Sequence, residues 1–394
     1  MRRGRRRGMT NTDKTIKDPV HDHIHVDGFA LDLLDTPEMQ RLRHVRQLGT
    51  AYLVYPSANH TRFEHSLGVY HLAVRALDNL GVTGVERDEV RAAALLHDVG
   101  HTPFSHNIED IVEEHVGKRH DEVDDLLDGE VARVLEERGV SPERVASLVR
   151  GEGRYGQLVS GALDVDRMDY LVRDAHHTGV PYGTIDSGRL VLELGYVDGE
   201  LVLGEGNVQT AEALLLARSL MHPTVYSHHV ARISTAMLER ATQRLIEADN
   251  GVDASEVRRM DDHELTVALR ENDVTRETAE RLAERRLYKR AVWKPRDELR
   301  DSTLDADPRE LEAEIAERAG DSVEPHEVIV DVSKPPVMAE TEARVVVDGE
   351  KRMLEDVSSL VRTLRRVHEE QWRFGVYTPE ESVEEVVDSA EGVV

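Results

Sequence analysis

The sequence predicts a mainly α-helical protein with short β-hairpins and a smaller α+β region towards its C-terminal end. Apolar residues recur at three- and four-residue spacing from about residue 31 to residue 246, which is the period of helices buried on one face. Short apolar runs surround Asp-Gly pairs at 198–199 and 348–349, a pattern typical of hairpins. With 394 residues, the chain is long enough for about two to three domains.

The N-terminal part of the chain consists of an irregular segment and then a first helix. Residues 10–30 show no sustained period and are predicted to be irregular. A helix is predicted over residues 61–81, where Thr61 and Glu64 have the spacing of a capping box. An apolar-periodic run follows this pair, so the helix is expected to bury one face in the core.

Three further helices are predicted from the same periodicity. They cover about residues 87–98, 160–176 and 207–247. The last of them contains Pro223, which has no backbone N–H to donate and should therefore kink the helix.

Strands are predicted where the helical period is interrupted. Residues 192–196 and 201–203 flank the first Asp-Gly turn, and residues 328–332 and 343–354 form two later runs. Between the first pair of strands and the second pair, residues 251–318 contain charged helical segments.

We therefore divide the chain into four regions. These are a basic, disordered arm (1–13), the main helical domain (14–250), an α+β C-terminal region (251–378) and a disordered acidic tail (379–394). The tail holds six acids and no Lys or Arg, so it is expected to be solvated. The arm begins MRRGRRRG, which suits either a nucleic-acid-binding arm or an over-extended gene start.

Composition excludes several kinds of chemistry. The chain has no cysteine, so disulfides, thiolate-bound metals and a cysteine nucleophile are excluded. It has 77 acids against 50 Lys and Arg, a net charge of −27, which argues against nucleic acid as a partner. Such an acidic surface also suits a protein from a high-salt environment, which we keep as a hypothesis. No apolar run has the length of a membrane span, so we expect a cytoplasmic protein without a membrane partner.

Histidines and carboxylates concentrate in three segments. The chain has 20 His, and the segments are RFEH (62–65), HDVGHTPFSH (97–106) and LDVDRMDYLVRD (163–174). Each one alone has an ordinary explanation, such as a core histidine, a chance His-Asp pair or a solvated helix face. Together, imidazole and carboxylate groups suit one divalent transition metal such as Mn, Fe, Zn or Ni.

Helical spacing predicts that residues able to bind a phosphate ester lie beside this metal site. Arg62 lies three residues from His65, and Tyr170 lies four residues from Asp166, so each pair shares a helix face. The same spacing recurs in Arg218, His222 and Tyr226. A metal, guanidinium groups and imidazoles together suit phosphate ester hydrolysis.

These residues resemble the HD superfamily of metal-dependent phosphohydrolases, and more closely the deoxynucleoside triphosphate triphosphohydrolases. The segments that carry the resemblance are DPVHDHI (18–24), DTPEMQRLRHVRQLG (35–49), NHTRFEHSLGV (59–69), HDVGHTPFSH (97–106) and DVDRMDYLVRDAHHTG (164–179). The resemblance implies an HD-domain helical bundle over about residues 14–246 and a homo-oligomer, either a dimer or a tetramer.

The resemblance also implies roles for individual residues. The metal ligands would be His65, His97, Asp98 and Asp166, with additional Mg arriving on the substrate. The catalytic residues would be His101, His106 and His120 at the α-phosphate, with Glu109 where the family usually has Asp. The substrate-binding residues would be Gln47, Leu48, Arg62, Arg167, Tyr170, Asp174, Arg218, His222 and Tyr226. Arg62, Arg167 and Arg218 would bind phosphates, and Tyr226 would pack against the 2′ carbon and exclude a ribose hydroxyl.

A regulatory nucleotide site is a further expectation from the resemblance. Lys14, Asp35, Gln40 and Arg43 match a nucleotide site at a subunit interface in the family. An ordinary explanation for Asp35 is that it caps the helix beginning at Thr36-Pro37.

The function implied is metal-dependent hydrolysis of deoxynucleoside triphosphates to deoxynucleoside and inorganic triphosphate. Two alternatives remain open at this stage. One is an HD phosphohydrolase for another nucleotide, either a monophosphate phosphatase or a phosphodiesterase. The other is a nucleotide sensor without catalysis.

Overall fold

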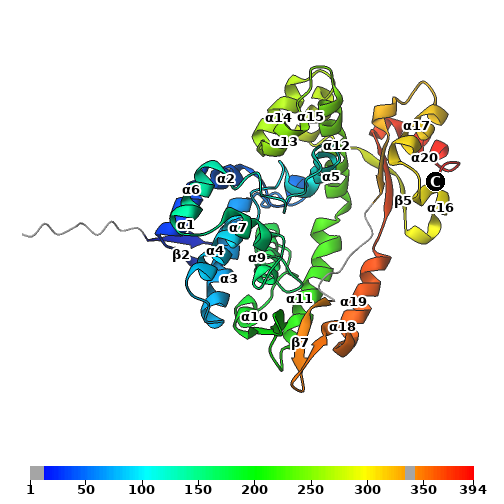
Figure 1. Ribbon diagram of the computed structural model, residues 1–394. Helices are drawn as coiled ribbons and strands as arrows, with labels where there is room; N and C mark the ends of the chain where they lie inside the picture. The colour runs from blue at the N-terminus through cyan, green and yellow to red at the C-terminus, as the bar shows by residue number, and fades with distance from the viewer. Residues whose placement is uncertain (1–12, 333–341) are drawn as a thin grey trace, which may run out of the picture.

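The computed structural model describes residues 13–332 and 342–394, and it is predominantly helical with three small sheets. Figure 1 shows helices gathered on one side of a long helix, α12 (His229–Glu247), and a smaller lobe on its other side. The predicted fold class is therefore confirmed. The predicted basic arm lies outside the described residues except for Asp13. No helix in the described ranges combines the length and apolarity that a membrane crossing requires.

An antiparallel hairpin opens the described chain, so the prediction of an irregular segment over residues 10–30 is wrong. Strands β1 (Lys14–Asp18) and β2 (Asp22–Val26) pair in register with Asp18 opposite Asp22. Ile24 and Val26 alternate with exposed histidines on β2 and are fully buried. This alternation of buried and exposed residues covers only a few positions and lies among charged residues, so the sequence shows no sustained period there.

The helical body contains the predicted helices together with several shorter ones. Its helices are α1 (Gly28–Leu34), α2 (Pro37–Arg41), α3 (Arg62–Asn79), α4 (Val85–Leu96), α5 (Glu109–Val116), α6 (Gly129–Glu137), α7 (Pro142–Val149), α8 (Gly156–Val159), α9 (Val165–Thr178), α10 (Ser187–Glu193) and α11 (Val208–Met221). Short turns of helix lie at η1 (Leu42–His44), η2 (Gly49–Leu53), η3 (Ser105–Asn107) and η4 (His222–Tyr226). Helix α3 is buried along most of its length and contacts both α4 and α9.

Three details of these helices differ from the predictions. Thr61 precedes α3, but its side chain makes no capping hydrogen bond, so the predicted capping box is absent. Helix α9 begins at Val165 because the Asp164 carboxylate accepts a hydrogen bond from the Arg167 backbone N–H and caps it. Pro223 breaks the predicted fourth helix completely, with the wider turn η4 separating α11 from α12.

Both predicted hairpins are present, and they join in one sheet. Strands β3 (Leu194–Val197) and β4 (Glu200–Leu203) form the first, and β7 (Arg344–Val347) and β8 (Glu350–Met353) form the second. The Asp and Gly of each turn have positive φ, as a two-residue hairpin turn requires. Parallel pairing of β4 with β7 connects the two hairpins.

The C-terminal half adds a helical cap and a separate lobe. Helices α13 (Ala254–Arg259), α14 (Asp262–Glu271) and α15 (Arg276–Ala283) share an apolar core with α12. The lobe holds a sheet in the order β5 (Lys289–Lys294), β9 (Phe374–Thr378), β6 (Ile329–Val332), with α16 (Asp301–Leu304), α17 (Pro308–Ala319) and α20 (Val383–Ala390). Helices α18 (Leu354–Val357) and α19 (Ser359–Glu370) follow the second hairpin. Strands β5 and β9 were not predicted.

The acidic C-terminal segment is folded, so the predicted disordered tail over residues 379–394 is wrong. Val386 and Ala390 of α20 are fully buried in the lobe, and Val393 and Val394 follow them into the same core. The acids of this helix occupy its other face. The apolar residues recur at helical spacing, and this pattern outweighs the charge count.

One buried carboxylate on α12 gives the fold a dependence on pH. Burial, together with the nearby charge of Asp110, raises the pKa of Glu239 from its usual 4.5 to about 7. The folded protein therefore holds this proton more tightly than the unfolded chain, and the free energy of unfolding falls as the pH rises from about 4.5 to about 7. We expect Glu239→Gln to stabilise the protein by about 2 kcal/mol at pH 8 and to change little at pH 4.5. Chemical denaturation at the two pH values measures this, with Glu247→Gln on the same helix as control. Equal effects of Glu239→Gln at both pH values would contradict the assignment.

Candidate metal centre and active site

Four side chains from three helices converge at the centre of the helical body. His65 comes from α3, His97 and Asp98 come from the end of α4, and Asp166 comes from the first turn of α9. The Nε2 atoms of His65 and His97 lie 3.3 Å apart, and Asp98 Oδ1 lies 3.3 Å from His97 Nε2. Asp166 Oδ1 lies 2.9 Å from His65 Nε2. The structure thus brings together all four predicted metal ligands.

The chemistry of this cluster fits a divalent cation. Two imidazole nitrogens and two carboxylates face one another, and three of these residues are buried. Burial alone would lower the pKa of His65, but its hydrogen bonds to Asp166 and Asp169 raise it to about 10. Without a metal, a proton on His65 therefore supplies the positive charge that the carboxylates require. Metal binding would displace this proton.

A second carboxylate, Asp169, orients the ligand His65. His65 Nδ1 donates to Asp169 Oδ2 at 2.8 Å, and His21 Nε2 donates to the other oxygen at 2.6 Å. Arg173 donates to Asp169 at 2.8 Å and to Asp18 at 2.9 Å, so the N-terminal hairpin is tied to the metal centre. Histidine ligands commonly donate their second N–H to a carboxylate in this way, which fixes the ring and the tautomer.

The space around Asp169 requires glycine on α3. A Cβ atom at Gly68 would lie 1.8 Å from Asp169 Oδ1 and 2.5 Å from Arg173 Nη2. Asp169 was not among the predicted site residues, although it lies one turn after Asp166 on α9 and therefore shares a helix face with it.

Replacing Asp169 by asparagine is expected to weaken metal binding about 10- to 100-fold, because the amide accepts a weaker hydrogen bond from His65. Metal titration by calorimetry measures the affinity. Asp186→Asn, at the N-terminus of the neighbouring α10, is the control and should leave the affinity unchanged. Unaltered metal affinity in Asp169→Asn would show that this contact has no role in positioning His65.

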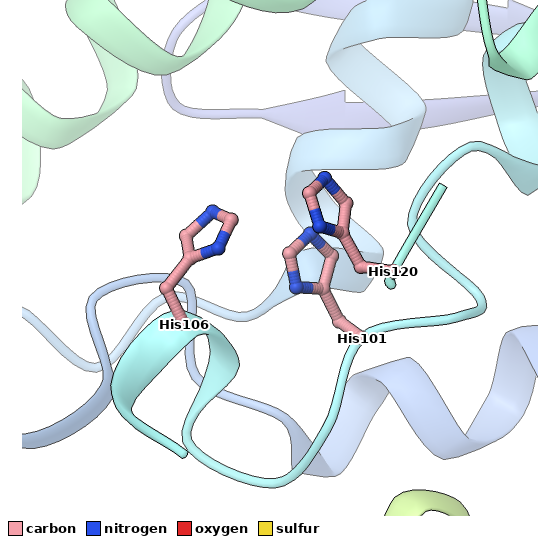
Figure 2. Close-up of side chains that lie close together, drawn as sticks. All are labelled: His101, His106 and His120. Carbon is pink, nitrogen blue, oxygen red and sulfur yellow. The ribbon is translucent and has the colours of Figure 1, made fainter. Parts of the chain in front are cut away.

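Three further histidines surround a glutamate beside the metal centre. Figure 2 shows the rings of His101, His106 and His120 turned towards one another, with His101 and His120 stacked at 4.2 Å between ring centroids. Glu109 Oε2 accepts from His106 Nδ1 at 2.7 Å, and Oε1 accepts from His120 Nδ1. Asp98 Oδ1 lies 3.3 Å from His101 Nε2, which links this cluster to the metal ligands.

Protonation in this cluster follows from burial and charge. Burial alone would raise the pKa of Glu109, but hydrogen bonds from His106 and His120 hold it well below its usual range. Burial and the nearby Arg62 lower the pKa of His101 well below its usual range. Glu109 is therefore an anion that holds two imidazoles in place, while His101 is neutral.

A cavity of about 350 Å³ is lined by His106 of the histidine cluster and by Arg62, which pairs with the predicted metal ligand Asp98. Eight of the nine predicted substrate-binding residues line it, namely Gln47, Leu48, Arg62, Tyr170, Asp174, Arg218, His222 and Tyr226. The Asp174 carboxylate accepts from Tyr226 Oη at 2.9 Å and from His60 Nε2 at 2.8 Å. His60 was not among the predicted site residues, although it belongs to the same histidine-rich segment.

Arg62 and Arg167, which are both predicted to bind phosphate, occupy different positions. Arg62 lines the cavity, and its Nη1 pairs with Asp98 Oδ2 at 2.9 Å. Arg167 Nη1 instead donates to the carbonyls of Gly161 and Ala162, at 2.5 and 3.0 Å. Arg167 is therefore not among the residues that line this cavity, and its predicted role in binding phosphate stays a prediction.

The four predicted regulatory residues lie on the N-terminal hairpin and the following helices. Lys14, Asp35 and Arg43 are exposed, and Gln40 accepts a hydrogen bond from Arg43 Nε at 2.8 Å. Asp35 ends α1, and Thr36 is the residue that precedes α2, although its side chain donates to the Leu33 carbonyl and makes no capping hydrogen bond. The capping explanation for Asp35 is therefore wrong.

The fold and the paired His and Asp clusters define the class of HD-domain phosphohydrolases. Residues 62–174 match the HD domain model, and residues 185–394 match the model of the HD-associated region. The chain is 32% identical over 396 residues to the uncharacterized protein MJ1154 of Methanocaldococcus jannaschii, covering 95% of this chain and 81% of that one. The chain belongs to the HD-domain phosphohydrolase family and carries its HD-associated region. An HD domain implies a divalent metal at the cluster of His65, His97 and Asp98.

Solved structures and curated relatives extend the comparison. A hypothetical protein from Aquifex aeolicus matches with a TM-score of 0.78 at 29% identity, covering 96% of this chain and 99% of that one. A phosphohydrolase from Bacteroides thetaiotaomicron matches with a TM-score of 0.74 at 26% identity, covering 93% and 99%. The human deoxynucleoside triphosphate triphosphohydrolase SAMHD1 is 30% identical over 62% of this chain. The matched region spans only 46% of that relative's length.

Proposed function

We propose that this protein hydrolyses deoxynucleoside triphosphates to deoxynucleosides and inorganic triphosphate. The observation that carries the proposal is one cavity lined by two kinds of side chain. Arg62, which pairs with Asp98, and His106, which is hydrogen-bonded to Glu109, suit a phosphate chain. Asp174 and Tyr226, which are hydrogen-bonded to each other, suit a sugar hydroxyl and a planar ring.

The side chains in and beside this cavity would have different roles in the reaction. Arg62 and Arg218 would bind phosphate oxygens and offset their charge. A divalent metal, when bound, supplies a Lewis acid and an activated water at the α-phosphorus. His106 or His120, held by Glu109, would donate a proton to the departing nucleoside 5′-oxygen. Asp174 would accept a hydrogen bond from the 3′-hydroxyl group.

Relatives support the same substrate class. The human enzyme and the Dictyostelium discoideum homologue, which is 32% identical over 58% of this chain, are both named deoxynucleoside triphosphate triphosphohydrolases. The chain spans about half the length of either protein, 49% and 46%. Their activity is therefore a proposal for this chain.

Product analysis tests the proposal. Each of the dNTPs and NTPs is incubated with the protein and Mn²⁺ or Mg²⁺, and the products are separated by ion-exchange chromatography. We expect deoxynucleoside and inorganic triphosphate from dNTPs, little turnover of NTPs, and none in EDTA. Release of orthophosphate or pyrophosphate would instead assign an HD phosphohydrolase of another nucleotide. Binding without turnover would indicate a nucleotide sensor.

We also propose homo-oligomerisation and a regulatory nucleotide at the surface that carries Lys14, Asp35, Gln40 and Arg43. The exposure of three of these side chains leaves them accessible to a ligand or a second subunit. Size measurement by light scattering, with and without added nucleotide, tests this. A monomer under both conditions would contradict it.

A further inference from the structure

A buried carboxylate from the HD-associated region contacts two segments that carry predicted site residues. Asp262 lies in the first turn of α14 and is 1% exposed. Its Oδ1 atom accepts a hydrogen bond from the backbone N–H of Phe104 at 2.7 Å. Its Oδ2 atom accepts from the backbone N–H and from Nη1 of Arg46, both at 3.1 Å. The first segment leads to His106 and the second to Gln47, and both of these residues line the proposed substrate cavity.

The segment that carries His106 has a strained backbone. Phe104 and Ser105 have φ angles of 54° and 60°, in the left-handed region that residues other than glycine rarely adopt. Two such residues in succession persist only where the surrounding structure holds them. The Phe104 side chain belongs to the apolar core that α12 shares with α13, α14 and α15, and Asp262 binds its backbone N–H. The helical cap thus holds both the side chain and the main chain of this turn.

The same turn is bonded to the arginine that is proposed to bind phosphate. Ser105 Oγ accepts a hydrogen bond from Arg62 Nε at 2.6 Å and donates to the Arg46 carbonyl at 2.5 Å. A Cβ atom at Gly49 would lie 2.0 Å from Asn107 Oδ1, so the two segments that Asp262 contacts also pack closely against each other. A displacement of the turn would therefore move several groups of the site together.

We propose that Asp262 is a positioning residue for the proposed hydrolysis. By binding the Phe104 and Arg46 N–H groups, its two oxygens fix where the His106 segment stands against the substrate. The inference rests on the proposed function and adds to it a residue from outside the HD domain, which ends at residue 174. A carboxylate accepts from both segments, whereas the single oxygen of an asparagine accepts from one. A shift of about 1 Å in such a group can lower the rate about a hundredfold.

Asp262→Asn tests the proposal in the full-length, metal-loaded protein. Single-turnover kinetics with a dNTP should show a chemical step about 10- to 100-fold slower than in the parent. The KM should change by less than about threefold, because Arg62 keeps its pairing with Asp98 at 2.9 Å. The metal content should stay unchanged, since Asp262 contacts none of the four predicted ligands.

Hydrogen exchange measures the position of the segment without any turnover. In the absence of nucleotide, the backbone amides of residues 104–107 should exchange at least about tenfold faster in Asp262→Asn than in the parent. An inactive parent protein would contradict the proposed function. Unchanged exchange would contradict this inference alone, so the two failures are distinguishable.

The neighbouring residue provides a matched control. Asp261 caps α14 by accepting from the backbone N–H groups of His263 and Glu264, at 2.8 and 2.9 Å. Asp261→Ala should therefore lower the melting temperature. It leaves the Asp262 contacts in place, so the chemical step and the exchange of residues 104–107 should stay within about twofold of the parent.

A milder variant covers the case in which Asp262→Asn does not fold. Arg46→Gln removes only the guanidinium part of the contact with Asp262, and the Arg46 side chain is 26% exposed. The fold should tolerate this change, and the chemical step should slow about three- to tenfold.

Four results would overturn the proposal. They are a chemical step in Asp262→Asn, or in Arg46→Gln if the first variant does not fold, within twofold of the parent; unchanged exchange of residues 104–107; an equal loss of rate in Asp261→Ala; and loss of the metal from Asp262→Asn. An equal loss in Asp261→Ala would show that only the stability of α14 matters. Loss of the metal would assign Asp262 to the support of the metal centre.

Discussion

Replacing Asp166 by alanine is expected to remove the bound divalent metal and to lower kcat/KM about a thousandfold or more. Its Oδ1 atom lies 2.9 Å from His65 Nε2, and it is the one ligand that α9 contributes. Loss of a ligand removes the Lewis acid and the activated water, which together are worth several kcal/mol of transition-state stabilisation. Metal analysis of the purified variant and steady-state kinetics measure the two effects.

The fold should survive this substitution. The Asp166 side chain is 34% exposed and lies in the first turn of its helix, so its removal leaves no cavity in the core. Circular dichroism should therefore match the parent protein. Asp301→Ala, in the exposed first turn of α16, is the control and should retain metal and activity. Full activity in Asp166→Ala would exclude this residue from the metal site.

Glu109→Gln is expected to lower kcat about 10²- to 10⁴-fold while the metal content stays unchanged. The carboxylate accepts from His106 at 2.7 Å and also from His120, and so it holds both imidazoles towards the substrate. A glutamine offers one acceptor oxygen and one donor NH₂ group, so it accepts from only one of the two rings. Single-turnover kinetics measures the chemical step.

The control for this variant lies on the same helix. Glu114 of α5 is exposed, and Glu114→Gln removes the same charge without touching a histidine. It should leave kcat within about twofold of the parent. If Glu109→Gln raised KM with kcat unchanged, Glu109 would act in binding and the proton-transfer role of the histidine pair would be wrong.

Local spacing predicts only part of the metal centre, namely the adjacent pair His97 and Asp98 at the end of a predicted helix. His65 and Asp166 lie on other helices, far from this pair in the sequence, so the full ligand set came from the resemblance. The resemblance to the HD superfamily supplied the order in which these helices meet. Eight of the nine residues that the resemblance implies for substrate binding line one cavity, and the guanidinium of the ninth, Arg167, donates to the carbonyls of Gly161 and Ala162, which precede its helix.

The support of the metal centre could not be predicted, because its contacts are long-range. His21 meets Asp169 across 148 residues of sequence, and His60 meets Asp174 across 114. Neither pair has a local period that distinguishes it from a surface histidine or a solvated acid. The N-terminal hairpin was missed for the same reason, since two short strands stabilise each other only once they are paired.

The C-terminal segment shows how composition can mislead. Six acids in 16 residues predicted a disordered tail, yet Val386 and Ala390 are buried in the lobe. The apolar residues at 383, 386, 387 and 390 have helical spacing, and the acids occupy the opposite face. Periodicity was the better guide here, because burial depends on which face is apolar and much less on the mean charge.

Hydrolysis in ¹⁸O-labelled water tests the central claim most directly. If the site directs water to the α-phosphorus, the bond from phosphorus to the nucleoside 5′-oxygen breaks, and the water oxygen joins the phosphate chain. Mass spectrometry should then find one ¹⁸O atom in inorganic triphosphate and none in the deoxynucleoside. Label in the deoxynucleoside hydroxyl, or labelled orthophosphate or pyrophosphate in place of triphosphate, would contradict the account.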